Sequence, residues 1–152
     1  MGLRTAGAYT RWLSVSGGLI LLLGVIHLAA APGTMRGIPE TVPAEFRSAF
    51  LFMFASAGLA ALFAGLMVLW GAYGVARQWR GAWTLALMSG LFAILMGAGA
   101  AAAMPRNPFS WLLLILGLSV LPPLILPLKA RGGDGEVLDF RRDEPKEKRT
   151  IH

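Results

Sequence analysis

Residues 48–73 read SAFLFMFASAGLAALFAGLMVLWGAY, a stretch without a single Asp, Glu, Lys or Arg. A helix rises about 1.5 Å per residue and the hydrocarbon core of a bilayer is roughly 30 Å thick, so about 20 apolar residues cross it. This stretch is longer than that. It therefore predicts a membrane-spanning helix.

Three further stretches have the same character, at residues 12–31, 82–104 and 109–128. A transmembrane β-barrel would instead show segments of about 10 residues with alternating polarity. Because backbone groups in lipid must be satisfied within helices or closed barrels, unbroken runs favour helices. We predict an all-α membrane protein, with a four-helix transmembrane bundle over residues 1–128.

The composition agrees with this class and excludes several others. Hydrophobic residues make up 56% of the chain and charged residues only 14%, against about a quarter in soluble domains. The absence of cysteine excludes disulfides, thiolate nucleophiles and cysteine-ligated clusters. No basic stripe interleaved with aromatic residues lies outside the spans, so nucleic acid is not an expected partner. The expected partners are the bilayer itself and other membrane helices.

The distribution of cations predicts the orientation. The chain has 14 Lys and Arg residues. With the amino terminus inside, all of them fall on the cytoplasmic side except Arg36, Arg47 and Arg106. The positive-inside rule then places both termini in the cytoplasm. A cleaved signal peptide is the alternative for the first span, because Arg4 and Arg11 precede an apolar run that ends in small residues. That run is longer than the usual signal core of about 7–15 residues, which favours a retained span.

Residues 129–152 differ from the rest in carrying many charges of both signs. Such a segment has little apolar surface to bury and is typical of disorder. We predict a disordered cytoplasmic tail.

Small residues recur every fourth position in two of the predicted spans. Apolar burial does not drive helix association in lipid, so such stripes let backbones approach closely and gain dispersion contacts. We predict that these faces pack against other helices, within the chain or in another copy. The residues are Ala57, Ala61, Gly65, Ala93, Gly97 and Ala101.

A weak internal repeat relates the first and third spans. Gly17, Gly24 and Pro32 recur at identical offsets as Gly90, Gly97 and Pro105, and the place of His27 is taken by Ala100 in the second copy. Two tandem helical hairpins in parallel orientation would give this pattern. A chance alignment of common membrane residues would give it too.

His27 is the one histidine within the four predicted spans. It lies about fifteen residues from the inner edge of its span, or roughly 22 Å by the helical rise, and so in the outer third of the bilayer. An ionisable residue in a membrane is a candidate functional residue. It could ligate a haem or metal, donate a hydrogen bond to a quinone or lipid headgroup, or accept a proton. A haem would need a second ligand such as Met104. In the alternative, the ring only meets water or a backbone carbonyl.

The loop at residues 32–47 is the longest predicted connection between spans. Pro43 and Glu45 mark a helix start within it, because proline suits the first turn and a carboxylate suits the positive helix end. Phe46, Phe50 and Phe54 recur every fourth residue and would lead from this loop to a shallow crevice beside His27. Four charged residues would stand at its mouth, namely Arg36, Glu40, Glu45 and Arg47.

Two local features support a resemblance to a known family. They are the histidine followed by small residues and a proline (His27-Leu28-Ala29-Ala30-Ala31-Pro32) and the glycine-bearing second span. Together with the length and the four spans, they resemble the DoxX-like and other small four-helix membrane proteins of bacteria. The resemblance covers the spans but not the tail. It implies a bacterial inner membrane and, for some members, an accessory role in membrane redox systems. It assigns no functional residue or cofactor.

Two functions remain open from the sequence. We favour a non-catalytic subunit or assembly factor of a membrane complex, because the spans carry no charge and have small-residue stripes. The alternative is a protein that binds a quinone, haem or lipid beside His27 at the outer leaflet, in a redox or carrier system. No nucleophile, base and oxyanion site are assembled by these residues, so an enzyme mechanism has no support.

Overall fold

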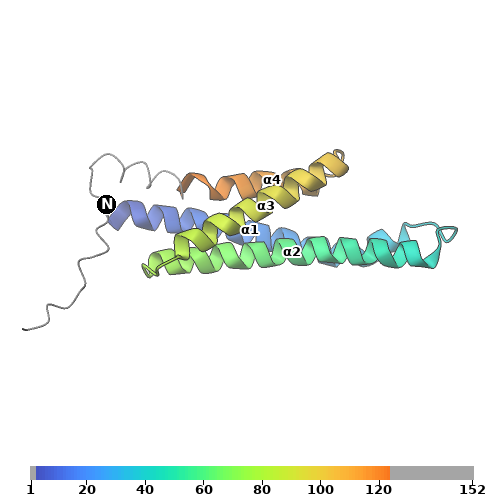
Figure 1. Ribbon diagram of the computed structural model, residues 1–152, viewed down its shortest axis with the longest axis horizontal. Coiled ribbons are helices and arrows are strands. Elements are labelled where there is room, and N and C mark those ends of the chain that lie inside the picture. The colour runs from blue at the N-terminus through green and yellow to red at the C-terminus, as the bar shows by residue number, and fades with distance from the viewer. Residues whose placement is uncertain (1–2, 124–152) are drawn as a thin grey trace, which may run out of the picture.

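The computed structural model describes residues 3–123, and these form four helices in an up-and-down arrangement (Figure 1). The described part of the chain contains no strand. The helices are α1 (Leu3–Arg36), α2 (Ala44–Ala76), α3 (Ala82–Ala103) and α4 (Pro108–Val120). The predicted all-α class is confirmed. Three of the helices, α1, α2 and α3, are long and apolar enough to cross a membrane.

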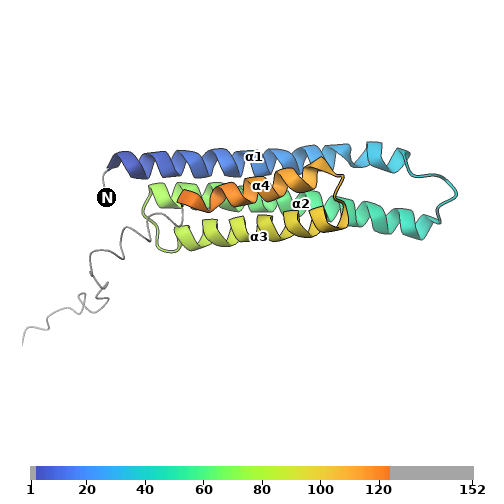
Figure 2. The ribbon, with the colours of Figure 1, turned by 90° about the horizontal axis from the view of Figure 1, so that it is seen from above.

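The four helices form two antiparallel hairpins that pack side by side. α1 packs along α2 and α3 packs along α4, while α2–α3 and α1–α4 contacts join the hairpins. The α1–α2 hairpin extends well beyond the end of the α3–α4 hairpin in both ribbon views (Figures 1 and 2). This difference follows from length, because α1 has 34 residues and α3 has 22.

The first connection is shorter than predicted, because α1 continues through Pro32 to Arg36. The predicted loop at residues 32–47 is therefore wrong in extent, and only residues 37–43 lie between the two helices. Pro32 cannot donate to the Leu28 carbonyl one turn earlier, but membrane helices tolerate such a missing bond. The Thr34 hydroxyl donates to the Ala30 carbonyl over 3.1 Å, in addition to the backbone bonds of the helix. α2 begins at Ala44, as Pro43 and Glu45 predict.

The fourth helix is shorter than the predicted span at residues 109–128. α4 has 13 residues and ends at Val120, immediately before Leu121 and Pro122. Proline lacks the N–H that would extend the hydrogen-bond ladder, so an early end is expected there. A bend at Leu121 is followed by helical backbone at Pro122 and Pro123, and residues 124–128 of the predicted span and the predicted tail at residues 129–152 lie outside the described residues.

Glycines set the distance between the two helices of each hairpin. A methyl group added to Gly24 would lie 2.5 Å from the Leu62 backbone nitrogen, and one added to Gly97 would lie 2.5 Å from the Leu114 nitrogen. Real side chains do not approach a backbone atom so closely. Each hairpin therefore depends on a glycine at its crossing point.

These glycine contacts follow the internal repeat seen in the sequence. Gly24 corresponds to Gly97 in the repeat, and Gly17 corresponds to Gly90. Gly17 lies against Val68, and Gly90 lies against Val120. On the partner helices, Leu62 and Leu114 are separated by the same number of positions as Val68 and Val120. The two hairpins thus use the same contacts in the same order.

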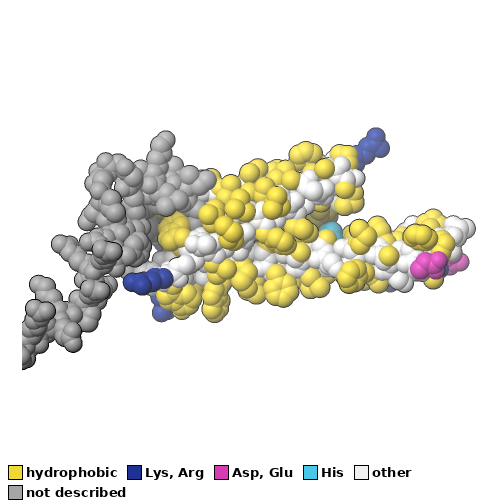
Figure 3. Space-filling model, viewed as in Figure 1, with side chains coloured by type: hydrophobic (Ala, Val, Ile, Leu, Met, Phe, Trp, Pro, Cys, Tyr) yellow, Lys and Arg dark blue, Asp and Glu magenta, His cyan; other side chains and the backbone are white. Residues whose placement is uncertain are grey.

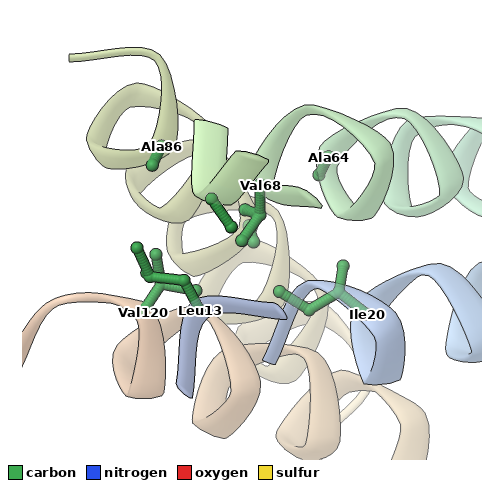
Figure 4. Close-up of a cluster of buried hydrophobic side chains, with 8 residues drawn as sticks. Leu13, Ile20, Ala64, Val68, Ala86 and Val120 are labelled. Atoms are coloured by element: carbon green, nitrogen blue, oxygen red, sulfur yellow. The ribbon is translucent and has the colours of Figure 1, made fainter. Parts of the chain in front are cut away.

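The tightest packing lies in the half of the molecule that contains the start of α1 and the end of α2. Leu13, Ile20, Val68 and Val120 are fully buried there, and the gaps between them are closed by small side chains (Figure 4). The small members of this cluster are Ala64, Ala72, Ala86 and Ala93. The other half of the bundle, where α3 ends and α4 begins, has no such cluster among the described residues.

Candidate functional site

A cavity of about 70 Å³ lies between the four helices, near the junction of α3 and α4. Leu23 and His27 of α1 line one wall, and Met104 and Asn107 of the α3–α4 connection close one end. Residues that correspond in the two hairpins face each other across it. The pairs are Leu23 with Met96, His27 with Ala100, Ala57 with Phe109 and Ala61 with Leu113. The cavity therefore lies between equivalent surfaces of the two hairpins.

Two buried polar atoms at this cavity have no hydrogen-bond partner among the described residues. They are Nε2 of His27 and Oγ of Ser110. Both residues line the cavity, and Ser110 is only 3% exposed. A buried polar group without a partner costs about 1–3 kcal/mol. This cost is offset only if something in the cavity binds these two atoms.

The imidazole of His27 is held between two phenylalanine rings. It stacks on Phe54 with ring centroids 3.9 Å apart, and it meets Phe109 in a T-shaped arrangement with ring centroids 6.0 Å apart. Gly58 gives the ring its space, since a methyl group at Gly58 would lie 3.1 Å from Cδ2 of His27. At the corresponding position of the second hairpin the chain has Ser110 instead of glycine, opposite Ala100 instead of histidine. Each hairpin thus contributes one of the two polar groups.

A second hollow of about 240 Å³ lies on the other side of His27. It shares His27, Asn107 and Phe109 with the inner cavity, and Ala30, Thr34 and Phe54 complete its lining. The two hollows therefore adjoin each other along His27, Asn107 and Phe109.

Sequence reasoning singled out His27 but missed the residues that complete the site. Ser110 gave no signal, because a serine near the start of a helix usually bonds its own backbone. Met104 was considered only as a second ligand of a haem and Met96 was not singled out, although both line the cavity. These groups come from α3 and α4, far from His27 in sequence, so only the packing of the hairpins identifies them.

The four charged residues predicted at the mouth of the site do not line either hollow. Arg36 ends α1, nine positions after His27, which corresponds to about 14 Å along the helix. Acidic side chains gather at the tip of the α1–α2 hairpin in the space-filling view (Figure 3). Glu40 and Glu45 are exposed there, as is Arg36, while Arg47 is partly buried.

The small-residue faces are buried against other helices of the same chain. Gly65 lies against the backbone of Leu21 on α1, and Gly97 lies against the backbone of Leu114 on α4. Ala61, Ala93 and Ala101 are buried as well, and Ala57 is partly buried at the cavity.

A haem does not fit within the inner cavity. His27 and Met104 are suitable axial ligands and both line the cavity. However, a cavity of about 70 Å³ is several times smaller than the roughly 300–1,000 Å³ that drug-sized ligands occupy. The site has room for a few atoms. Among the described residues, no cluster of three His, Cys, Asp or Glu side chains is placed to hold a metal ion.

Comparisons of the chain with protein-family models, with curated proteins and with solved structures find no match. The geometry of the site is therefore the basis for the functional argument.

Proposed function

We propose that this chain is a multi-pass membrane protein that binds a small ligand in the cavity between His27 and Ser110. The observation that supports the proposal is the pair of unpartnered buried atoms, Nε2 of His27 and Oγ of Ser110, at one cavity. The cavity is large enough for more than one water-sized group, because about 10–15 Å³ holds one. The ligand, or the part of it that enters, is therefore small and forms polar contacts with both hairpins.

The distribution of side chains supports a membrane setting for this site. Large apolar side chains cover the outside of the helices, and charged ones lie towards the ends (Figure 3). α3 has 22 residues and a length of about 33 Å, which matches the hydrocarbon core. Aromatic residues lie at both of its ends. Trp79 packs on Trp70 and Tyr73 at one end, and the Trp111 indole donates to the Pro105 carbonyl at the other. Such positions are typical of the membrane interfaces.

The orientation can be tested with reporter fusions. Fusions after Gly2 and after His152 should report the cytoplasm, and an insertion within residues 37–43 should report the opposite side, because cations are concentrated at the two termini and around Arg77 and Arg80. The measurement is paired alkaline phosphatase and fluorescent protein activity in a bacterial host. A carboxyl terminus outside the cytoplasm would contradict the orientation and would place the cavity at the inner leaflet.

The ligand proposal is tested by native mass spectrometry of the full chain released from detergent, which records bound molecules and metal ions alike. Wild-type protein should carry an added mass that His27→Ala loses and Ser110→Ala retains at lower occupancy. Ser89→Ala is the matched control, because Ser89 is also a buried serine but its hydroxyl donates to the Leu85 carbonyl of its own helix. An added mass that all variants keep equally, or no added mass in the wild type, would refute the proposal.

A role as a subunit of a membrane complex is the second candidate, and the end of the α1–α2 hairpin favours it. Phe46, Phe52 and Met53 are 64%, 73% and 69% exposed on the part of α2 that precedes Phe54, towards the hairpin tip. Exposed apolar residues of a membrane helix face lipid or another helix, and the end of this hairpin extends beyond α3 and α4, which leaves it free to contact helices of another protein (Figure 2). The same native mass spectra separate the candidates, since a subunit would carry a protein mass instead of a small one.

A further inference from the structure

Three side chains around the cavity carry donor atoms of the kind that soft metal ions prefer. His27 contributes an imidazole nitrogen that has no other partner, and Met96 and Met104 contribute thioether sulfurs. Imidazole and thioether ligands together suit Cu(I) among the biological metals. All three residues line the same cavity of about 70 Å³.

The lining also argues against harder or more highly charged ions. Among residues 3–123, no carboxylate, lysine or arginine lines the cavity, whereas Ca²⁺ and Mg²⁺ are bound mainly by carboxylate and carbonyl oxygens. The cost of moving an ion into an apolar interior rises steeply with its charge, and neutral ligands do not offset that charge. A monovalent ion is therefore the least costly cation for this site.

The two hairpins differ at the residues that provide these donors. The positions in the first hairpin that correspond to Met96 and Met104 are Leu23 and Ala31, and the position in the second that corresponds to His27 is Ala100. The shared hairpin contacts therefore do not require either sulfur or the imidazole. Ala100, which corresponds to His27 in the repeat, lines the cavity as well, and its short side chain occupies little of the space there.

We propose that the cavity binds a soft monovalent metal ion, Cu(I), through Nε2 of His27 and the Sδ atoms of Met96 and Met104. The proposal names the ligand of the function proposed above and rests on it. The Ser110 hydroxyl, a harder donor, would hold a water molecule at the remaining side of the ion. The ion binds in its reduced state, so binding requires no electron transfer.

The test uses the full chain without a histidine tag, purified in detergent, with Ag(I) as a redox-inert probe. Isothermal titration gives its affinity, and Cu(I) is measured under anaerobic conditions by competition with a chromogenic chelator. We expect one site per chain. His27→Ala should weaken binding by about 100-fold, and Met96→Leu or Met104→Leu by at least about tenfold, which is roughly 1.4 kcal/mol each.

Met88→Leu is the control, because Met88 lies on α3 and, unlike Met96 and Met104, does not line the cavity. Methionine and leucine have similar volumes, so the three leucine variants should all fold. Met88→Leu should bind Ag(I) within about twofold of the wild type. Equal weakening in Met88→Leu and Met96→Leu would mean that sulfurs in general bind the ion, and would overturn the assignment.

Failure of this inference and failure of the proposed function give different results. If Ag(I) and Cu(I) do not bind but an organic mass is lost in His27→Ala, the metal assignment is wrong and the ligand site stands. If neither the metals nor any other His27-dependent mass binds, both are wrong.

Discussion

Gly97→Leu is expected to prevent the α3–α4 hairpin from forming, with loss of most of the folded protein. A side chain at Gly97 would meet the backbone nitrogen and Cα of Leu114 at 2.5 and 2.7 Å, and a backbone cannot move aside as a side-chain end can. Overpacking costs typically about 1–3 kcal/mol where side chains can adjust. Here the helices themselves must separate, so we expect a loss above this range, measured as detergent-solubilised monodisperse protein and its melting temperature.

Gly99→Leu provides the matched control for this substitution. Gly99 lies two positions further along the same helix, and an added methyl group there would meet nothing within 4 Å. Both variants carry the same loss of glycine and the same gain of apolar surface. Gly99→Leu should therefore fold like the wild type. Equal behaviour of the two variants would show that close contact between α3 and α4 does not stabilise the fold.

Ala100→Leu is expected to abolish ligand binding while the protein keeps its fold. Ala100 lines the same cavity as His27, and the added carbon atoms would fill part of its volume of about 70 Å³. Filling a cavity with apolar atoms commonly stabilises a protein by about 0.5–2 kcal/mol. We therefore expect an unchanged or higher melting temperature together with loss of the His27-dependent mass in native mass spectra.

Ala98→Leu separates this effect from a general effect of leucine on α3. Ala98 is exposed and does not line the cavity. This variant should keep the bound mass. If Ala100→Leu also kept it, the ligand would lie outside the inner cavity, and the outer hollow between His27, Thr34 and Phe54 would be the site to test next.

The candidate site was only half visible in the sequence. His27 is conspicuous because it is the one histidine in a set of charge-free apolar runs. Ser110 and Met96 are common residues of apolar helices, and nothing in their neighbourhood distinguishes them. They become part of a site because the α1–α4 and α2–α3 contacts bring the second hairpin against the first. Because these residues lie far from His27 in the sequence, the sequence does not show that they form one site with it.

The expected mouth of the site was wrong for a related reason. The predicted loop began at Pro32, which placed Arg36 and Glu40 in the connection at the mouth of a crevice beside His27. Within an apolar segment, however, a helix keeps its backbone hydrogen bonds more completely than a loop does. α1 therefore continues to Arg36 and carries these charges away from the cavity.

The sequence by itself determined the class of structure, because the length and apolarity of residues 12–31, 48–73 and 82–104 allow little besides long helices. It also determined which faces have small residues. Only the tertiary structure decided which helix each face meets, with Gly65 against Leu21 and Gly97 against Leu114. Small residues permit close approach to any helix, so they do not specify a partner. The partner, and with it the cavity that joins His27 to Ser110, is selected by the fit of all four helices together.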